Sequence, residues 1–409
     1  MSAEQAAIAY LQRPQAIRDR CQQLFQLCQA DQLEHFTCNL SQLDVAAAYV
    51  VKTTQELYPD LKIPFHSRWR HFDAGGVPRL AQLNQAFQGQ SVAAATRSRL
   101  DLVIISVLLD AGAGTQWRYA DAATGKVLGR SEGLAVASLR AFQQGTFSAD
   151  AGVPLQVDAT GLLRLTEGDL AQAFQVTEAN PLVGLAGRLS LLHQLGHALK
   201  AQPARFGTKP ARPGHLFDYW QQQFPDTWDA GRLLTQVLVS FGSIWPGRVA
   251  IAGTNLGDVW PHLALPAEPL GANLVPFHKL SQWLTYSLVE PLTAAGVTVT
   301  NLNALTGLAE YRNGGLCVDL GLLTPKHSAV TAQAHLPSSA VVVEWRALTV
   351  ILLDMIGDRV CQQLHKTPTE LPLIKVLEGG TWAAGRRLAK QLRSTGAPPI
   401  IIQSDGTVF

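Results

Sequence analysis

Hydrophobic residues recur at intervals of three and four along the first part of the chain, from Ala3 to about Leu57, with Gln, Asp and Lys between them. This spacing places apolar side chains on one face of a helix. Leu24, Phe25 and Cys28 follow it, as do Ala47 and Val50. We therefore expect two or three N-terminal helices within residues 1–60, packing on the main body of the protein.

The same spacing predicts helices over several later ranges. They are Ser131 to Gly145, Thr166 to Phe174, Leu182 to Leu199, Ala230 to Gly242, Pro276 to Glu290, Val341 to Leu364 and Trp382 to Arg393. Ser131 stands where a helix N-cap is expected, and Pro276 and Pro291 are expected to begin and end the helix between them. No stretch has the length or bias of an interdomain linker, so we expect a single domain over residues 1–409.

Strands are expected to be few and short. Alternation around Thr124-Gly125 predicts a hairpin over Trp117 to Arg130, and short strands are expected over Val297 to Leu302, Leu316 to Leu320 and at the start of Ile400 to Phe409. The apolar run within Arg97 to Leu109 fits either a buried strand or a buried helix, and Ile63 to Gly76 fits a loop or a helix entry. The predicted fold class is mainly α (α+β), a helix-rich globule.

Composition and charge narrow the classes of function. With 47% hydrophobic and 16% charged residues the chain can bury a large core. The formal net charge of +2 provides no long-range field toward nucleic acid or a membrane, so an anion would need a local cluster of cations. Five cysteines without CxxC spacing, no signal-peptide pattern and no long apolar run together predict a cytoplasmic protein.

Four segments combine residues suited to chemistry. In FHSRWRHFD, Arg68 and Arg70 with two histidines could bind a phosphate, or form an aromatic and cationic surface loop. In SVLLDAGAGTQW, Asp110 follows an apolar element and precedes a glycine-rich turn. Its carboxylate could contact a ligand there, or it could cap a neighbouring helix. Adjacent acids, which a phosphoribosyl-diphosphate loop needs, are missing there.

The other two segments lie in the second half of the chain. The predicted helix after Pro276 carries polar and aromatic residues on adjoining stripes, which indicates the edge of a polar cavity or an amphipathic surface helix: His278, Lys279, Gln282, Trp283 and Tyr286. In the other segment an acid, a phenol, a cation and an amide precede a Gly pair: Glu310, Tyr311, Arg312 and Asn313. These residues could belong to a functional site or to a solvated loop. Trp382 lies in LEGGTW ahead of Arg386. No metal is expected, since His193 and His197 lack the glutamate of a zinc motif, and no cofactor fingerprint is present.

Several of these segments resemble one family. FHSRWRHFDAGG, SVLLDAGAG, GRSEGLAVASLRAF, LVPFHKLSQWLTYSLVEPL, LTGLAEYRNGGL, LEGGTWAAGR and SDGTVF, taken in order, are similar to the uracil catabolism protein 4 family over about Ile63 to Phe409. The resemblance implies a role in uracil breakdown, in which a ribosyl compound is opened and urea is released. It also favours the helix over the strand for Arg97 to Leu109.

A second set of short blocks resembles the queuosine salvage nucleosidases. The blocks are Asp110-Ala111 with Trp117, Gly129 to Ser131 with Arg140-Ala141, and Ala309 to Arg312, where Glu310 replaces an Asp. This resemblance implies a mostly helical fold and hydrolysis of a ribosyl N-glycosidic bond, a reaction that needs a carboxylate to stabilise positive charge and to orient or deprotonate water.

The resulting hypothesis is hydrolysis of ribosylurea or its 5'-phosphate. Glu310 and Asp110 are the expected carboxylates, with Glu310 favoured. Candidate cations for the phosphate are Arg68, Arg70, His278, Lys279 and Arg312; Trp283, Tyr286 and Trp382 are candidate walls, and Gln282 or Asn313 would meet the urea. A ligand-binding or scaffold protein of the pathway and a phosphoribosyltransferase-like enzyme are the alternatives.

Overall fold

The computed structural model describes residues 1–224 and 227–403, and most of them are helical. The helices are α1 (Ala3–Leu11), α2 (Pro14–Gln29), α3 (Leu43–Leu57), α4 (Arg68–Phe72), α5 (Arg79–Ala86), α6 (Val92–Leu108), α7 (Arg130–Gln143), α8 (Ala159–Arg164), α9 (Glu167–Ala173), α10 (Leu185–Ala201), α11 (Pro203–Phe206), α12 (Leu216–Gln223), α13 (Ala230–Phe241), α14 (Lys279–Ala294), α15 (Tyr311–Asp319), α16 (Ala329–Ala332), α17 (Ala340–Gln363), α18 (Leu373–Val376) and α19 (Trp382–Leu392).

Strands occur as two-stranded pairs in the described residues. The pairs are β1 (Phe36–Cys38) with β10 (Leu323–Pro325), β2 (Arg118–Asp121) with β3 (Lys126–Gly129), β4 (Trp228–Asp229) with β9 (Val299–Thr300), β5 (Ala250–Ile251) with β6 (Thr254–Asn255), β7 (Val259–Pro261) with β8 (Leu274–Pro276), and β11 (Ala334–His335) with β12 (Ile401–Ile402). The predicted class, mainly α with a few short strands, is confirmed.

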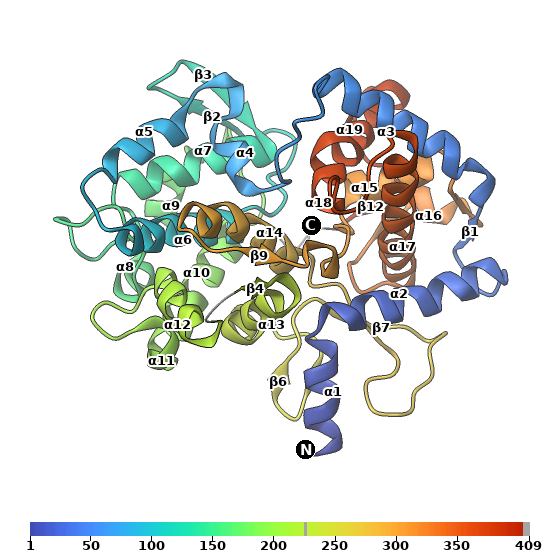
Figure 1. Cartoon of the computed structure of the whole chain (residues 1–409), viewed down its shortest axis with the longest axis horizontal. Helices are drawn as coiled ribbons and strands as arrows, with labels where there is room; N and C mark the ends of the chain where they lie inside the picture. The colour runs from blue at the N-terminus through green and yellow to red at the C-terminus, as the bar shows by residue number, and fades with distance from the viewer. Residues whose placement is uncertain (225–226, 404–409) are drawn as a thin grey trace.

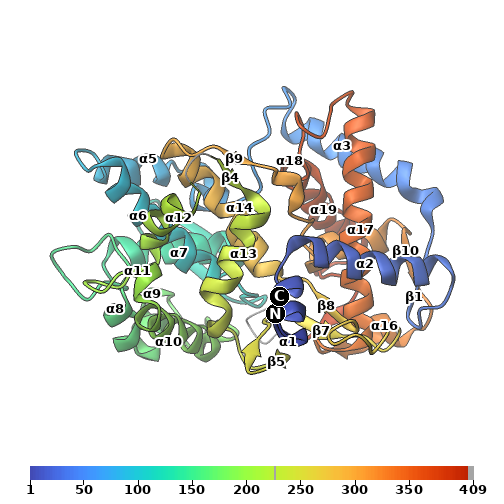
Figure 2. The same cartoon turned by 60° about the horizontal axis from the view of Figure 1, so that its bottom comes forward.

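The helices gather in two halves. Figure 1 shows α4 to α13 on one side and α2, α3 and α15 to α19 on the other, and Figure 2 shows the same division from another direction. Helix α14 packs on α4, α6 and α13 of the first half, while α2 and α3 pack on α17 in the second. One cluster of buried hydrophobic side chains extends through both halves, from Ile17 to Ile400. That residues 1–409 form a single domain stays a prediction.

Most predicted elements are present. The N-terminal segment forms three helices, residues 92–108 form the buried helix α6, and the hairpin β2–β3 closes around Thr124-Gly125. Strand β12 lies within the predicted C-terminal strand, whereas the tail after Gln403 lies outside the described residues.

Some sequence predictions are wrong. The segment 316–320 is not a strand, because Glu310 caps α15 and this helix buries Leu316 and Cys317 in the core. Pro291 lies inside α14, whose last turn continues past it and buries Leu292 completely. Pro276 belongs to β8, and α14 begins only at Lys279.

Candidate functional site

A pocket of about 300 Å³ lies where the two halves meet. The loop that follows α6 and the segment just before β12 contribute to its wall. The first turns of four helices, α7, α14, α15 and α19, contribute further residues. The lining residues are His66, His71, residues 110–115, Arg130, Ser131, Glu132, Lys279, Trp283, Leu308, Glu310, Tyr311, Arg312, Trp382, Arg386, residues 395–398 and Ile402. Several helices begin here, and charged side chains from their first turns meet in one place.

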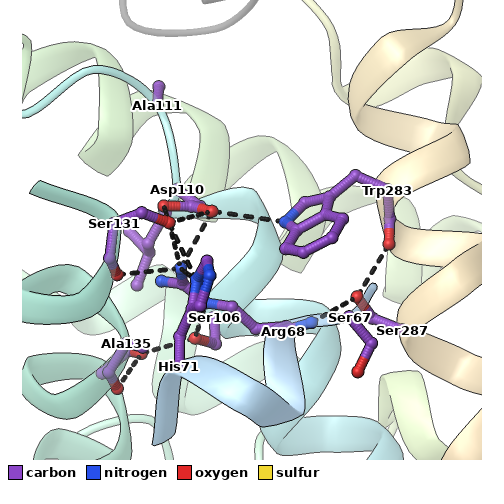
Figure 3. A network of polar contacts seen from close by, with 12 residues as sticks. Ser67, Arg68, His71, Ser106, Asp110, Ala111, Ser131, Ala135, Trp283 and Ser287 are labelled. Atoms are coloured by element: carbon purple, nitrogen blue, oxygen red, sulfur yellow. Dashed lines mark hydrogen bonds and ion pairs between the residues drawn. The ribbon is translucent and has the colours of Figure 1, made fainter. Parts of the chain in front are cut away.

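Asp110 is held by three side chains. Arg68 Nη1 lies 2.8 Å from Oδ2, Ser131 Oγ donates within 2.7 to 2.8 Å of the carboxylate, and Trp283 Nε1 donates to Oδ2 at 3.2 Å. Figure 3 shows these groups converging on the carboxylate from three elements. Arg68 is fully buried, whereas the Asp110 side chain retains 9% of its surface toward the pocket. The pocket therefore contains a rigidly positioned carboxylate.

His71 adjoins this group through Ser131. The Nδ1 atom of His71 lies 3.0 Å from Ser131 Oγ, and burial together with the Arg68 charge lowers the pKa of the imidazole. A neutral ring can donate from Nδ1 to Ser131 Oγ while the hydroxyl donates to Asp110. In that arrangement the other ring nitrogen, Nε2, is left as an acceptor on a residue that lines the pocket.

Glu310 brings a second carboxylate to the pocket as the N-cap of α15. Its two oxygens accept the backbone N–H groups of Arg312 and Asn313, each at 2.6 Å. Burial raises the pKa of this carboxyl, although the two amide bonds and the nearby Lys279 charge act in the opposite direction. A carboxylate whose pKa is raised in this way is a stronger base than an exposed one.

Cations surround the two carboxylates. Burial lowers the pKa of Lys279, against the attraction of Glu310 and Asp110. Arg312 is 5% exposed and donates to the carbonyl oxygen of Gly396 at 2.8 Å. Arg386 of α19 pairs with Glu132 of α7 at 2.5 Å, so this ion pair joins the two halves at the pocket. Although burial raises the pKa of Glu132, Arg386 and His71 outweigh it and keep the pKa below its usual value.

Aromatic rings form another part of the wall. The rings of His66 and Trp283 are 4.7 Å apart, and His71 lies 6.2 Å from Trp382. His66 Nδ1 also lies 2.7 Å from the carboxylate of Glu378, which orients the imidazole. The arrangement suits a flat or ring-shaped polar ligand.

The pocket unites seven of the thirteen residues predicted from the sequence. Those seven are Asp110, Lys279, Trp283, Glu310, Tyr311, Arg312 and Trp382. The six others do not line it: Arg68, Arg70, His278, Gln282, Tyr286 and Asn313.

Three of the six support the site indirectly. Arg68 holds Asp110, whereas Arg70 pairs with Glu290. Gln282 binds the Thr306 backbone and side chain, and the Tyr286 hydroxyl donates to the Thr306 carbonyl at 2.9 Å. Both contacts hold Thr306, which precedes Glu310 by four residues in the chain.

The two remaining residues of the six bond to backbone carbonyl groups. The Asn313 amide donates to the Leu308 carbonyl at 3.1 Å, and His278 Nε2 lies 2.8 Å from the Leu11 carbonyl.

Sequence reasoning missed several lining residues. Ser131 was expected to cap a helix, but the N-cap of α7 is Gly129, and Ser131 binds Asp110 instead. Glu132 and Arg130 also line the pocket, and neither was among the predicted site residues. Arg130 has a positive φ of 55°, a conformation that depends on the fold and that seven other non-glycine residues in the described part of the chain share.

Two further features concern metal binding and membrane insertion. Within residues 1–224 and 227–403, no three His, Cys, Asp or Glu side chains are grouped as metal ligands would be. No helix in that part of the chain has the length and apolar character needed to cross a membrane.

Comparison with known proteins places the chain in a family. Residues 10–409 match the family described as "Protein of unknown function (DUF1688)". Protein urg3 of Schizosaccharomyces pombe is 42% identical over the whole of both chains. Uracil catabolism protein 4 of Lachancea kluyveri is 38% identical over 98% of this chain and 99% of its own length. The chain therefore belongs to the DUF1688 family, the family of uracil catabolism protein 4.

Proposed function

We propose that this protein acts in uracil catabolism as an N-glycosidase that hydrolyses ribosylurea, or its 5'-phosphate, to urea and ribose or ribose phosphate. The pathway follows from the name of the relative with 38% identity over nearly its full length. The reaction type is supported by one observation above all: Asp110 and Glu310, contributed by different halves of the molecule, line the same pocket.

Cleavage of a ribosyl C–N bond develops positive charge on the sugar. Carboxylates stabilise that charge and activate the attacking water, as the paired acids of glycosidases do. Asp110 suits the first role because Arg68, Ser131 and Trp283 fix its carboxylate beside the pocket. Glu310 suits the second because burial raises its pKa toward that of an effective general base.

The proposed step balances as a hydrolysis. Glu310 removes a proton from water as the water oxygen bonds to the anomeric carbon. The C–N bond breaks with its electron pair on the urea nitrogen, and that nitrogen takes up a proton, so the overall reaction consumes one water. The proton that Glu310 took from water passes to the departing urea nitrogen, which restores the carboxylate.

The volume and the lining residues of the pocket are compatible with this substrate. A volume of about 300 Å³ is at the lower end of small-molecule pockets, which run from roughly 300 to 1,000 Å³. Trp283 and Trp382 provide apolar contact, and the imidazole of His71 provides a polar group for a sugar hydroxyl or an amide.

The test is incubation of purified protein with ribosylurea and, separately, with its 5'-phosphate, followed by measurement of urea. Release of urea that depends on protein concentration is expected from at least one compound. A failure to release urea from both would contradict the hydrolase assignment. If either compound still raised the melting temperature in that case, the pathway alternative of a ligand-binding protein would replace it.

A further inference from the structure

We propose that the pocket contains a subsite for a phosphate-like dianion, formed by Arg130 and Arg312, so that the substrate is the 5'-phosphorylated ribosyl compound. This inference rests on the proposed function for its choice of substrate. The anion subsite itself rests on the charges and backbone groups that line the pocket.

Two arginines that line the pocket take no part in its salt bridges. Asp110 is paired with Arg68, and Glu132 is paired with Arg386. Glu310 has two neighbouring cations, Lys279 and Arg312, and its single charge can balance only one of them. Arg130 and Arg312 line the pocket and form no salt bridge with any residue in the described part of the chain. Two unmatched guanidinium groups correspond to the charge of one phosphate monoester.

Of the two arginines, Arg312 provides the stronger evidence for an anion subsite. It is only 5% exposed, and its contacts are the Gly396 carbonyl and the face of Tyr311, at 5.1 Å from the ring centroid. A buried cation without a carboxylate partner is costly unless a ligand supplies the opposite charge. The neighbouring charge of Arg312 also adds to burial in lowering the pKa of Arg130, so the two cations lie close enough to repel each other.

The backbone at Arg130 is strained in a way that accompanies function. Arg130 has a φ of 55°, in the left-handed region that non-glycine residues rarely adopt, at the first position of α7. Strain of this kind persists at sites where it aims a side chain or a backbone group. Gly129, the N-cap, has no side chain to accept the first-turn N–H groups of α7, and within this turn the Glu132 carboxylate accepts the backbone N–H of its own residue.

The loop Ala111–Thr115 adds further donors to the same pocket. Arg188, 1% exposed, donates to the carbonyl oxygens of Ala111 at 2.5 Å and Gly112 at 3.3 Å. Since the C=O and N–H of a peptide unit point in opposite directions, these bonds turn the following N–H groups, of Gly112 and Ala113, away from Arg188. Both residues line the pocket, and the carbonyl oxygens of Ala111 and Gly112 are already engaged by Arg188.

The experiment measures anion binding separately from turnover. Melting temperatures of wild-type protein, Arg130→Gln and Arg130→Lys are measured with ribose 5-phosphate, inorganic phosphate or ribose. Arg13→Gln is the matched control, because Arg13 is an exposed arginine that does not line the pocket. We expect both phosphates, but not ribose, to stabilise wild-type protein and Arg13→Gln. Arg130→Gln should lose most of the stabilisation and Arg130→Lys should retain part of it.

Kinetics then connect the subsite to the substrate. Arg130→Gln should raise KM for ribosylurea 5'-phosphate about tenfold or more relative to its effect on KM for unphosphorylated ribosylurea, whereas Arg13→Gln should change neither. Equal stabilisation of wild-type protein by ribose and ribose 5-phosphate would overturn the anion subsite even if urea is released. Stabilisation by phosphate that depends on Arg130, with no urea from either compound, would instead contradict the proposed function and leave the subsite standing.

Discussion

The guanidinium of Arg68 lies 2.8 Å from the carboxylate of Asp110, and the Arg68 side chain has no exposed surface. The same guanidinium bonds to Ser106 and Ser131, so it ties α6 and α7 to Asp110. Arg68 was expected from the sequence to meet a substrate phosphate. Its charge is instead committed to a carboxylate, which explains why other cations must serve a ligand.

Replacing Arg68 by Met should be strongly destabilising. The variant leaves the Asp110 carboxylate buried without its partner, and loss of one member of a buried pair costs about 3–5 kcal/mol. Chemical denaturation monitored by circular dichroism measures this cost. The control is Arg97→Met, which removes a pair with Asp218 at 2.6 Å whose side chains are 30% and 34% exposed. It should cost about 1 kcal/mol or less. Equal losses in the two variants would contradict the structural role given to Arg68.

Periodicity located the helices well because it reports directly on which face of an element is buried. It was less informative about partners. His278, Gln282 and Tyr286 were expected at a cavity because polar groups stand out on an apolar helix. In the structure they bind backbone groups of Leu11, Phe277 and Thr306, since α14 is buried on nearly every side. Sequence shows that a polar side chain needs a partner, but the fold decides which partner it finds.

The site carboxylates were predictable for a different reason. Asp110 and Glu310 each stand at the end of an apolar segment, where helices begin or end and side chains can face a cavity. The pair Glu132 and Arg386 was not predictable, because its members are 254 residues apart and each alone has an ordinary helical setting. Arg130 could not be identified either, because its unusual φ depends on how β3 enters α7.

Glu310→Gln should reduce urea release by about 100-fold or more, since the amide cannot accept a proton from water. The amide also keeps only one acceptor oxygen for the two backbone N–H groups of α15, so the melting temperature is measured alongside the rate. Glu370→Gln is the matched control: Glu370 also accepts a backbone N–H, from Thr367, but it is exposed and outside the pocket. Full activity in Glu310→Gln would exclude Glu310 as the base.

The pH dependence of kcat/KM should report the environment of Glu310. Burial raises its pKa above the usual 4.5, and a general base works only when it is ionised. Activity should therefore fall as the pH falls through that raised pKa, with an inflection above 4.5. His71, whose pKa burial lowers from 6.5, could produce a limb in the same range. The profile is therefore repeated with His71→Gln. An inflection at or below 4.5 in both proteins would contradict the assignment.

Gly385 allows α19 to approach α15 directly behind Arg312. A Cβ at this position would lie well under 3.0 Å from the Arg312 carbonyl oxygen, and backbone cannot move aside as a flexible side chain can. Gly385→Ala should therefore destabilise the protein by about 1–3 kcal/mol through overpacking. It should also weaken phosphate-dependent stabilisation, because Arg312 shifts with its backbone.

Gly247→Ala is the control, because a Cβ there meets no atom within 4 Å and no positive φ restricts the position. Its unfolding free energy should remain within about 0.5 kcal/mol of wild type. Both variants are compared by chemical denaturation and by the melting-temperature shift with ribose 5-phosphate. If Gly385→Ala matched Gly247→Ala in both measurements, the close approach of α19 to α15 would not control the position of Arg312. Loss of stability with an unchanged ligand shift would show that the contact supports the fold without shaping the anion subsite.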